Sequence, residues 1–116
     1  IEPTIVRDIA EGARLVDEEQ FGPALPIIKF SDPEEALARI HRTAEGLGGS
    51  VWSSDAEAAR DLAVRLDAGT VWVNKHGELD PGIPFSGAKQ SGVGTELGRA
   101  GLEEFTQRRV INISSS

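Results

Sequence analysis

Residues 50–74, SVWSSDAEAARDLAVRLDAGTVWVN, decide the fold of this chain. The stretch opens on the short run Ser50-Val51-Trp52 and closes on Thr70-Val71-Trp72-Val73-Asn74, both rich in the β-branched and aromatic residues that strands favour. Between the two runs, apolar residues recur at the spacing of one helix face: Ala58, Leu62, Ala63 and Leu66. The stretch therefore predicts a strand, a helix and a second strand.

Signals for both helix ends flank these apolar residues. Ser54 and Glu57 stand at the spacing of a capping box, in which the two side chains satisfy free backbone amides of the first turn. Gly69 follows the last apolar residue, where helices commonly stop. We therefore expect the helix to begin at Ser54 and to end before Gly69.

Upstream, the same alternation of strands and helices continues. Residues 2–6 have the β-branched content of a short strand, and residues 24–30 (ALPIIKF) form an apolar run of strand length. Asp32 can cap a helix whose first position is Pro33. That helix should bury Leu37, Ile40 and Ala44 and end at Gly48-Gly49.

Downstream, regular periodicity fades and then returns. Residues 75–98 carry glycine, proline and serine every few positions, which predicts a long ordered loop. A short helix is expected over about residues 99–106, and residues 108–113 alternate like a strand before a serine tail. The whole pattern predicts an α/β fold with a mainly parallel sheet and covering helices.

Composition narrows the possible functions. The chain of 116 residues has a formal net charge of −7, which disfavours binding to nucleic acid or to anionic membranes. It contains no cysteine, so disulfides, thiolate metal sites and thiol nucleophiles are excluded within it. No run of apolar residues is long enough for a membrane span and no signal peptide is recognisable, so we expect a cytoplasmic protein. The start at Ile1 and the absence of Met suggest a fragment.

Taken singly, the motifs are weak. The run Glu18-Glu19-Gln20-Phe21-Gly22-Pro23 could present a carboxylate and a ring to a ligand, but the residues alone favour a solvated acidic turn. In residues 92–98, Leu97 stands where a dinucleotide fingerprint needs its third glycine, so we reject that reading. His41 and His76 lack metal-site spacing, and the pair Lys89 and Ser91 matches no Ser-Lys catalytic arrangement.

As an ordered set, however, four motifs resemble the successive C-terminal motifs of the aldehyde dehydrogenase superfamily. The set consists of residues 18–23 (EEQFGP), 46–52 (GLGGSVW), 68–74 (AGTVWVN) and 84–98 (PFSGAKQSGVGTELG). The resemblance covers nearly the whole chain, in order and with similar spacing.

This resemblance implies an NAD(P)-dependent oxidation of an aldehyde to a carboxylic acid through a cysteine thioester. The cysteine, the general-base glutamate and the dinucleotide domain of the family lie upstream of the part that this chain resembles. The chain itself is therefore expected to be inactive, with no catalytic residue of its own. NAD or NADP would be the cofactor of the parent enzyme, and an aldehyde and a second subunit of a homo-oligomer would be its partners.

The resemblance also assigns cofactor contacts. Glu19 matches the glutamate that holds the nicotinamide ribose, and Phe21 matches the phenylalanine that packs near the nicotinamide ring. A carboxylate can accept hydrogen bonds from both ribose hydroxyls, and a neighbouring ring restricts where the nicotinamide can move.

On the substrate side, Phe85 matches the phenylalanine of a Pro-Phe-Gly-Gly motif near the active site. Ser86 departs from that motif, in which glycine is usual. Asn74 matches an asparagine that supports the catalytic loop. The segment 75–84 corresponds to a variable loop that shapes the aldehyde tunnel, with Leu79 as a lining residue.

We accordingly expect residues 1–107 to be the C-terminal portion of the catalytic domain. Residues 108–116 are expected to form an oligomerisation strand and tail. Two other interpretations remain open: a non-catalytic interaction module that kept the fold, and a small metal-binding or nucleotide-binding protein. The encoding gene would distinguish the module from the enzyme, because a gene that ends near these residues favours the module.

Overall fold

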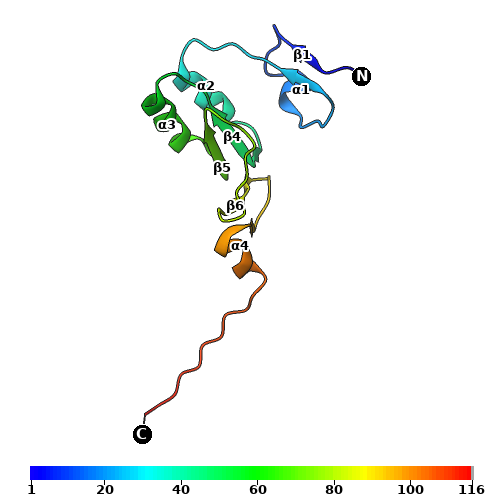
Figure 1. Ribbon diagram of the computed structural model, residues 1–116. Coiled ribbons are helices and arrows are strands. Elements are labelled where there is room, and N and C mark those ends of the chain that lie inside the picture. Colours follow the sequence, from blue (N-terminus) through cyan, green and yellow to red (C-terminus); the bar gives the residue numbers. More distant parts are fainter. Residues whose placement is uncertain (116) are drawn as a thin grey trace. The chain divides into compact units, whose positions relative to one another are not determined.

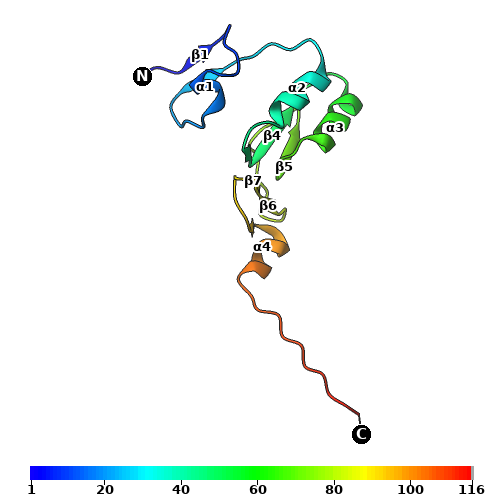
Figure 2. The same cartoon turned by 180° about the vertical axis from the view of Figure 1, so that it is seen from behind.

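The computed structural model describes residues 1–115 and contains both helices and strands, as predicted. The chain divides into two compact units, residues 1–43 and residues from Ala44 onward. Within residues 1–115, the strands form four separate two-stranded sheets, of which two are parallel and two are antiparallel. The α/β class is confirmed, and the expected mainly parallel sheet is replaced by small sheets of both kinds. Figures 1 and 2 follow the elements along the chain.

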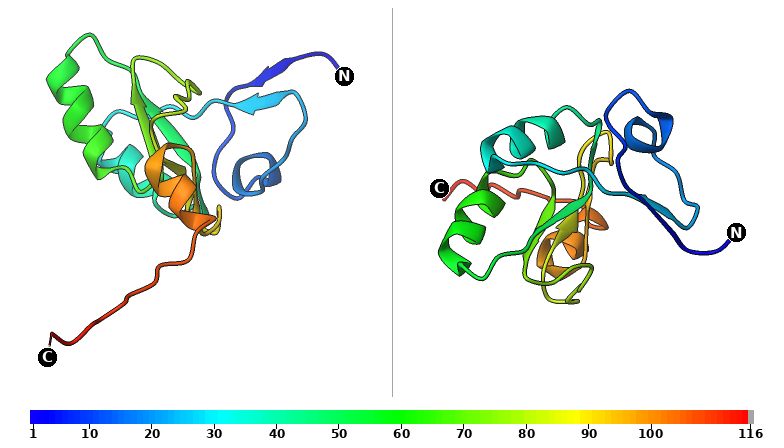
Figure 3. Two further views of the ribbon diagram at one scale, coloured as in Figure 1. Left: turned by 60° about the horizontal axis from the view of Figure 1, so that its bottom comes forward. Right: turned by 90° about the horizontal axis from the view of Figure 1, so that it is seen from above.

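The stretch that predicted strand, helix and strand forms the centre of the second unit. Strand β4 (Gly48–Val51) pairs in parallel with β5 (Thr70–Val73), and helix α3 (Ala56–Arg65) connects them. Figure 3 shows α3 lying along the two strands, where Ala59 is fully buried and Trp72 is 8% exposed. Burial of Ala59 fixes the helix on the sheet, whereas the Trp72 ring lies beside Gly48 of β4.

The N-cap of α3 differs from the prediction by one residue. Asp55, and not Ser54, is the cap, and its carboxylate accepts hydrogen bonds from the amides of Glu57 and Ala58 at 3.1 and 3.0 Å. Both residue types can cap, so sequence alone does not separate them. The predicted capping box is therefore wrong, although the predicted helix is present.

Helix α2 (Pro33–Ile40) begins as predicted and ends early. Asp32 accepts a hydrogen bond from the Glu34 amide at 3.0 Å, and Pro33 occupies the first turn. The predicted continuation to Gly48 is wrong, because strand β3 (Glu45–Gly46) takes over after a short turn. Local periodicity favoured more helix, but pairing with a distant strand determines the conformation from residue 45 onward.

The predicted loop 75–98 contains three short strands. β3 pairs antiparallel with β7 (Ala88–Lys89), and β6 (Phe85–Ser86) pairs antiparallel with β8 (Thr95–Glu96). Helix α4 (Gly98–Glu104) then follows, close to its predicted place. The long loop is thus ordered by two strand pairs. One joins β6 and β8 within the loop, and the other joins β7 to β3 upstream of it.

Gly46 joins these short strands to the β4–β5 pair. Its amide donates to the Ser91 hydroxyl at 2.8 Å, and its carbonyl accepts from the Gly69 amide at 2.9 Å. A Cβ on Gly69 would lie 1.7 Å from the Ser86 carbonyl oxygen, far inside contact distance. Ser91 therefore has a structural partner, and Gly69 is required by the close approach of two backbones.

In the first unit, strand β1 (Thr4–Val6) pairs in parallel with β2 (Ala24–Pro26), and the short helix α1 (Arg14–Asp17) lies between them in sequence. Both strands are shorter than predicted, since residues 2–3 and 27–30 lie outside them. Ile27 still donates its amide to the Val6 carbonyl at 2.8 Å. This parallel pair closes the segment 7–23 into one loop.

Residues 106–115 form neither helix nor strand within the chain. Val110, Ile111 and Ile113 are 90%, 75% and 82% exposed. The strand expected there is not formed in this single chain, and its pairing with another subunit stays a prediction. Ser116, the end of the expected tail, lies outside the described residues.

We predict that Gly69→Ala lowers the free energy of unfolding by more than about 3 kcal/mol, because its Cβ would force apart β5 and the Ser86 backbone. Gly82→Ala is the matched control, since its Cβ would meet the flexible Asp80 side chain at 3.2 Å. That control should change stability by less than about 1 kcal/mol. Urea denaturation of both variants measures the difference, and equal effects would refute the steric explanation.

Candidate functional site

The two neighbouring carboxylates at residues 18 and 19 have different surroundings. Arg14 binds Glu18 in a two-pronged contact, with Nε to Oε1 and Nη2 to Oε2 both at 2.9 Å. Glu19 is exposed and has no hydrogen-bond or ion-pair partner among the described residues. Of the pair, Glu19 is therefore the carboxylate available to a ligand.

A side-chain clamp fixes the turn that follows Glu19. The Gln20 amide oxygen accepts from the Gly22 amide at 2.7 Å, and its Nε2 donates to the Ala24 carbonyl at 2.7 Å. Phe21, between these contacts, is 93% exposed. The Phe21 ring is thus exposed two residues from the Glu19 carboxylate, which has no partner in the part of the chain that the structure describes. Gln20 holds the backbone between them.

Asn74 stands directly after β5, in the left-handed backbone region with φ of 55°. Its Oδ1 accepts from the Ser53 amide and its Nδ2 donates to the Ser53 carbonyl, both at 2.9 Å. The side chain thereby bonds to both backbone groups of one residue, just beyond the end of β4. Asn74 holds the two strand ends together, and Asn is a residue type that tolerates positive φ.

A buried tryptophan braces the loop that follows Asn74. The Trp72 indole donates to the Glu78 carbonyl at 2.8 Å, and its ring meets the His76 ring edge-on at 5.2 Å between centroids. Lys75 and Glu78 form an ion pair at 3.0 Å. Leu79, the next residue, is 51% exposed. Sequence reasoning missed this brace, although a buried indole N–H generally requires an acceptor.

Phe85 is half-buried in β6, where it pairs with Glu96 of β8. Ser86, the departure from the usual glycine, is tolerated here because the close approach is made to its backbone by Gly69. Among the predicted site residues, Glu19 and Phe21 belong to the first unit. Asn74, Leu79 and Phe85 belong to the second.

The described residues show neither a metal site nor a membrane span. They contain no group of three His, Cys, Asp or Glu side chains arranged to hold a metal ion. None of their helices is long and apolar enough to cross a bilayer.

Comparison with known proteins decides the family. The model of the aldehyde dehydrogenase family matches residues 1–111. The chain belongs to the aldehyde dehydrogenase family. Phenylacetaldehyde dehydrogenase of Pseudomonas fluorescens is 43% identical over 115 residues, covering 98% of this chain and 23% of that protein. Betaine aldehyde dehydrogenase of Bacillus subtilis is 45% identical over 106 residues, covering 91% and 22%.

Solved aldehyde dehydrogenases match the fold as well. Betaine aldehyde dehydrogenase of Staphylococcus aureus, in complex with NAD+, superposes with a TM-score of 0.86 at 35% identity, over 99% of this chain and 25% of that one. By sequence, the chain also matches the protein named succinate-semialdehyde dehydrogenase [NADP(+)] of Deinococcus radiodurans. The two are 39% identical over 111 residues, which cover 96% of this chain and 23% of that protein. This aldehyde dehydrogenase chain thus spans about a quarter of the length of the relatives that it matches.

We predict that Asn74→Asp destabilises the protein by about 1–3 kcal/mol, because a carboxylate cannot donate to the Ser53 carbonyl and leaves it facing a negative oxygen. Asp keeps the size of Asn and its tolerance of positive φ, so the substitution tests the donor alone.

Ser53→Ala is the matched control for that variant. It removes the hydroxyl that accepts from the Asp55 amide at 3.0 Å but leaves both backbone partners of Asn74 in place. Its cost, measured by urea denaturation, should be below that of Asn74→Asp. A cost equal to or above it would contradict the role given to the Asn74 amide.

Proposed function

We propose that this chain is the C-terminal part of the catalytic domain of an NAD(P)-dependent aldehyde dehydrogenase that oxidises an aldehyde to a carboxylic acid. Residues 1–107 would belong to the catalytic domain and residues 108–116 to an oligomerisation strand and tail. The family membership and the coverage of about a quarter of the relatives support this assignment. The aldehyde itself is left open, because most of the tunnel would come from other parts of the parent.

The nucleophile must lie elsewhere in the parent enzyme. The chain contains no cysteine, and the thioester chemistry implied by the family requires one. We therefore expect these residues to supply binding and positioning groups, and to oxidise no aldehyde on their own.

The observation that carries the cofactor assignment is the difference between the two adjacent carboxylates. Glu18 is engaged by Arg14, whereas Glu19 is exposed and has no partner among the described residues. A carboxylate of this kind can accept from two ribose hydroxyls, and the exposed Phe21 ring can limit the position of the nicotinamide. NAD or NADP, when bound, would accept the hydride of the oxidation. The residues present fit this group, with Glu19 and Phe21 holding its nicotinamide end.

On the substrate side, we assign Phe85 and Leu79 to the aldehyde pocket. Leu79 is half-exposed on a loop that Trp72 braces, so its side chain has a fixed base from which to contact a ligand. Asn74 would act as support for the catalytic loop through the strand ends that it joins. Its amide is already engaged by the Ser53 backbone, which favours a positioning role over substrate contact.

In the full-length parent, we predict that Glu19→Gln slows single-turnover hydride transfer by roughly tenfold or more, with a smaller effect on aldehyde binding. The substitution keeps the shape and removes the charge that strengthens acceptance from the ribose. Glu18→Gln is the matched control, and should change the rate by less than about twofold because its exposed contact with Arg14 contributes little. Equal rates in Glu19→Gln and wild type would refute the cofactor assignment.

We also propose that the C-terminal residues 110–113 form a strand by pairing with another subunit. The apolar side chains Val110, Ile111 and Ile113 are exposed here, and a β-favouring segment of this kind is a template for pairing. The protein should therefore be oligomeric in light scattering, and a variant truncated after Gln107 should shift toward smaller species. If the full-length protein and the truncated variant have the same number of subunits at the same concentration, residues 110–113 do not pair between subunits.

A further inference from the structure

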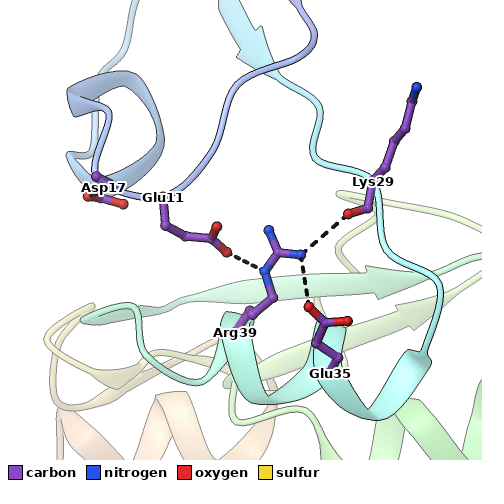
Figure 4. A network of polar contacts seen from close by, with 6 residues as sticks. Glu11, Asp17, Lys29, Glu35 and Arg39 are labelled. Atoms are coloured by element: carbon purple, nitrogen blue, oxygen red, sulfur yellow. Dashed lines mark hydrogen bonds and ion pairs between the residues drawn. The ribbon is translucent and has the colours of Figure 1, made fainter.

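One guanidinium, that of Arg39 in α2, meets both ends of the segment that carries Glu19 and Phe21 (Figure 4). Its Nε donates to the Glu11 carboxylate, in the turn before α1. Its Nη1 donates to the Lys29 carbonyl at 3.4 Å, beyond the end of β2. Segment 11–29 is therefore closed at both ends by the same side chain.

The first arm of this segment runs from Glu11 to Glu19 through a chain of short contacts. The Gly12 amide donates to the Asp17 carboxylate at 2.8 Å, which fastens the turn to the far end of α1. Within α1, the Glu18 amide donates to the Arg14 carbonyl at 2.9 Å. The turn at Glu11 is thus bonded to the helix that ends immediately before Glu18 and Glu19.

The second arm runs from Lys29 back to Phe21. The Ile27 amide donates to the Val6 carbonyl at 2.8 Å, which holds the chain beside β1. Gln20 Nε2 donates to the Ala24 carbonyl and so fixes the turn that contains Phe21. The two arms meet at the residues proposed to hold the cofactor.

Arginine suits this position for a geometric reason. Its planar head carries five N–H donors, so it can bind Glu11 and Lys29 while Nη1 also lies 3.8 Å from the Glu35 carboxylate. The Arg39 side chain is 20% exposed, so its contacts are less screened by water than those of a fully exposed pair. The hydrogen bond from Arg39 lowers the pKa of the Glu11 carboxyl below its ordinary value, which keeps the pair charged.

From these contacts we infer that Arg39 is a positioning residue for the nicotinamide cofactor. It acts through Glu11 and the Lys29 carbonyl to fix both arms of segment 11–29, and it does not touch the cofactor itself. The inference rests on the proposed role of Glu19 and Phe21. It adds a residue that the resemblance to the family did not single out.

The test uses the full-length enzyme and NADH as the probe. Arg39→Met should raise the Kd of NADH, measured by fluorescence titration, and the KM of the oxidised cofactor by about tenfold, while the KM of the aldehyde at saturating cofactor changes by less than about twofold. Glu11→Gln should shift the cofactor values in the same direction by a smaller factor, because the Lys29 contact remains. The double variant should be no worse than Arg39→Met alone, since Arg39→Met already removes the contact with Glu11.

Arg42→Met is the matched control, because Arg42 lines one surface hollow together with Glu11, Glu35 and Arg39. Its side chain makes no hydrogen bond among the described residues. Its cofactor Kd should equal that of wild type. If Arg39→Met does not fold, Glu11→Gln and Arg39→Lys decide the question, and unchanged NADH binding in both overturns the inference. Unchanged binding in a folded Arg39→Met, together with weakened binding in Glu19→Gln, overturns this inference while leaving the cofactor assignment intact. Wild-type behaviour of Glu19→Gln would refute the cofactor assignment instead.

Discussion

The hydrogen bond of 2.9 Å between the Gly69 amide and the Gly46 carbonyl is the constraint on which the second unit depends. It joins the β3–β7 pair to the β4–α3–β5 unit at a point where Gly69 also meets the Ser86 backbone at a distance that no side chain allows. β5 starts one residue later and ends at Val73, directly before Asn74. The position of the loop with Leu79 therefore follows from a backbone contact made at the opposite end of the strand.

In the first unit, side chains with partners inside the chain alternate with exposed ones. The polar groups of Glu18 and Gln20 form hydrogen bonds within the chain. The side chains of Glu19 and Phe21 beside them are exposed. Polar groups that are satisfied internally are poor ligand groups, because binding would first have to break their bonds. The bonds of Glu18 and Gln20 therefore hold the backbone, while the Glu19 carboxylate and the Phe21 ring remain exposed to a ligand. Asn74 is the contrasting case, since its amide is engaged and its contribution is to geometry.

Local signals predicted those features whose partners are close in the sequence. The Asp32 cap and Pro33 lie within one turn, so the start of α2 was predictable. The end of α2 was not, because residues 45–46 follow the pairing requirement of Ala88 and Lys89, which lie far along the chain. The alternation in residues 50–74 predicted strand, helix and strand correctly. For the candidate site, the sequence identified the pair of carboxylates but could not say which one Arg14 would bind.

The contacts also bear on how the chain is stabilised. Among the described residues, the buried apolar core consists of Leu37, Ala59 and Trp72, while large side chains such as Phe21, Val93 and Phe105 remain 88% or more exposed. An aromatic side chain can bury about 150–250 Å² of surface, so each exposed ring forgoes a sizeable hydrophobic contribution. Hydrogen bonds and short strand pairs therefore carry much of the order seen here. Such exposed apolar surface is what a segment of a larger catalytic domain would bury against the rest of its enzyme, which supports the proposed function independently of the sequence motifs.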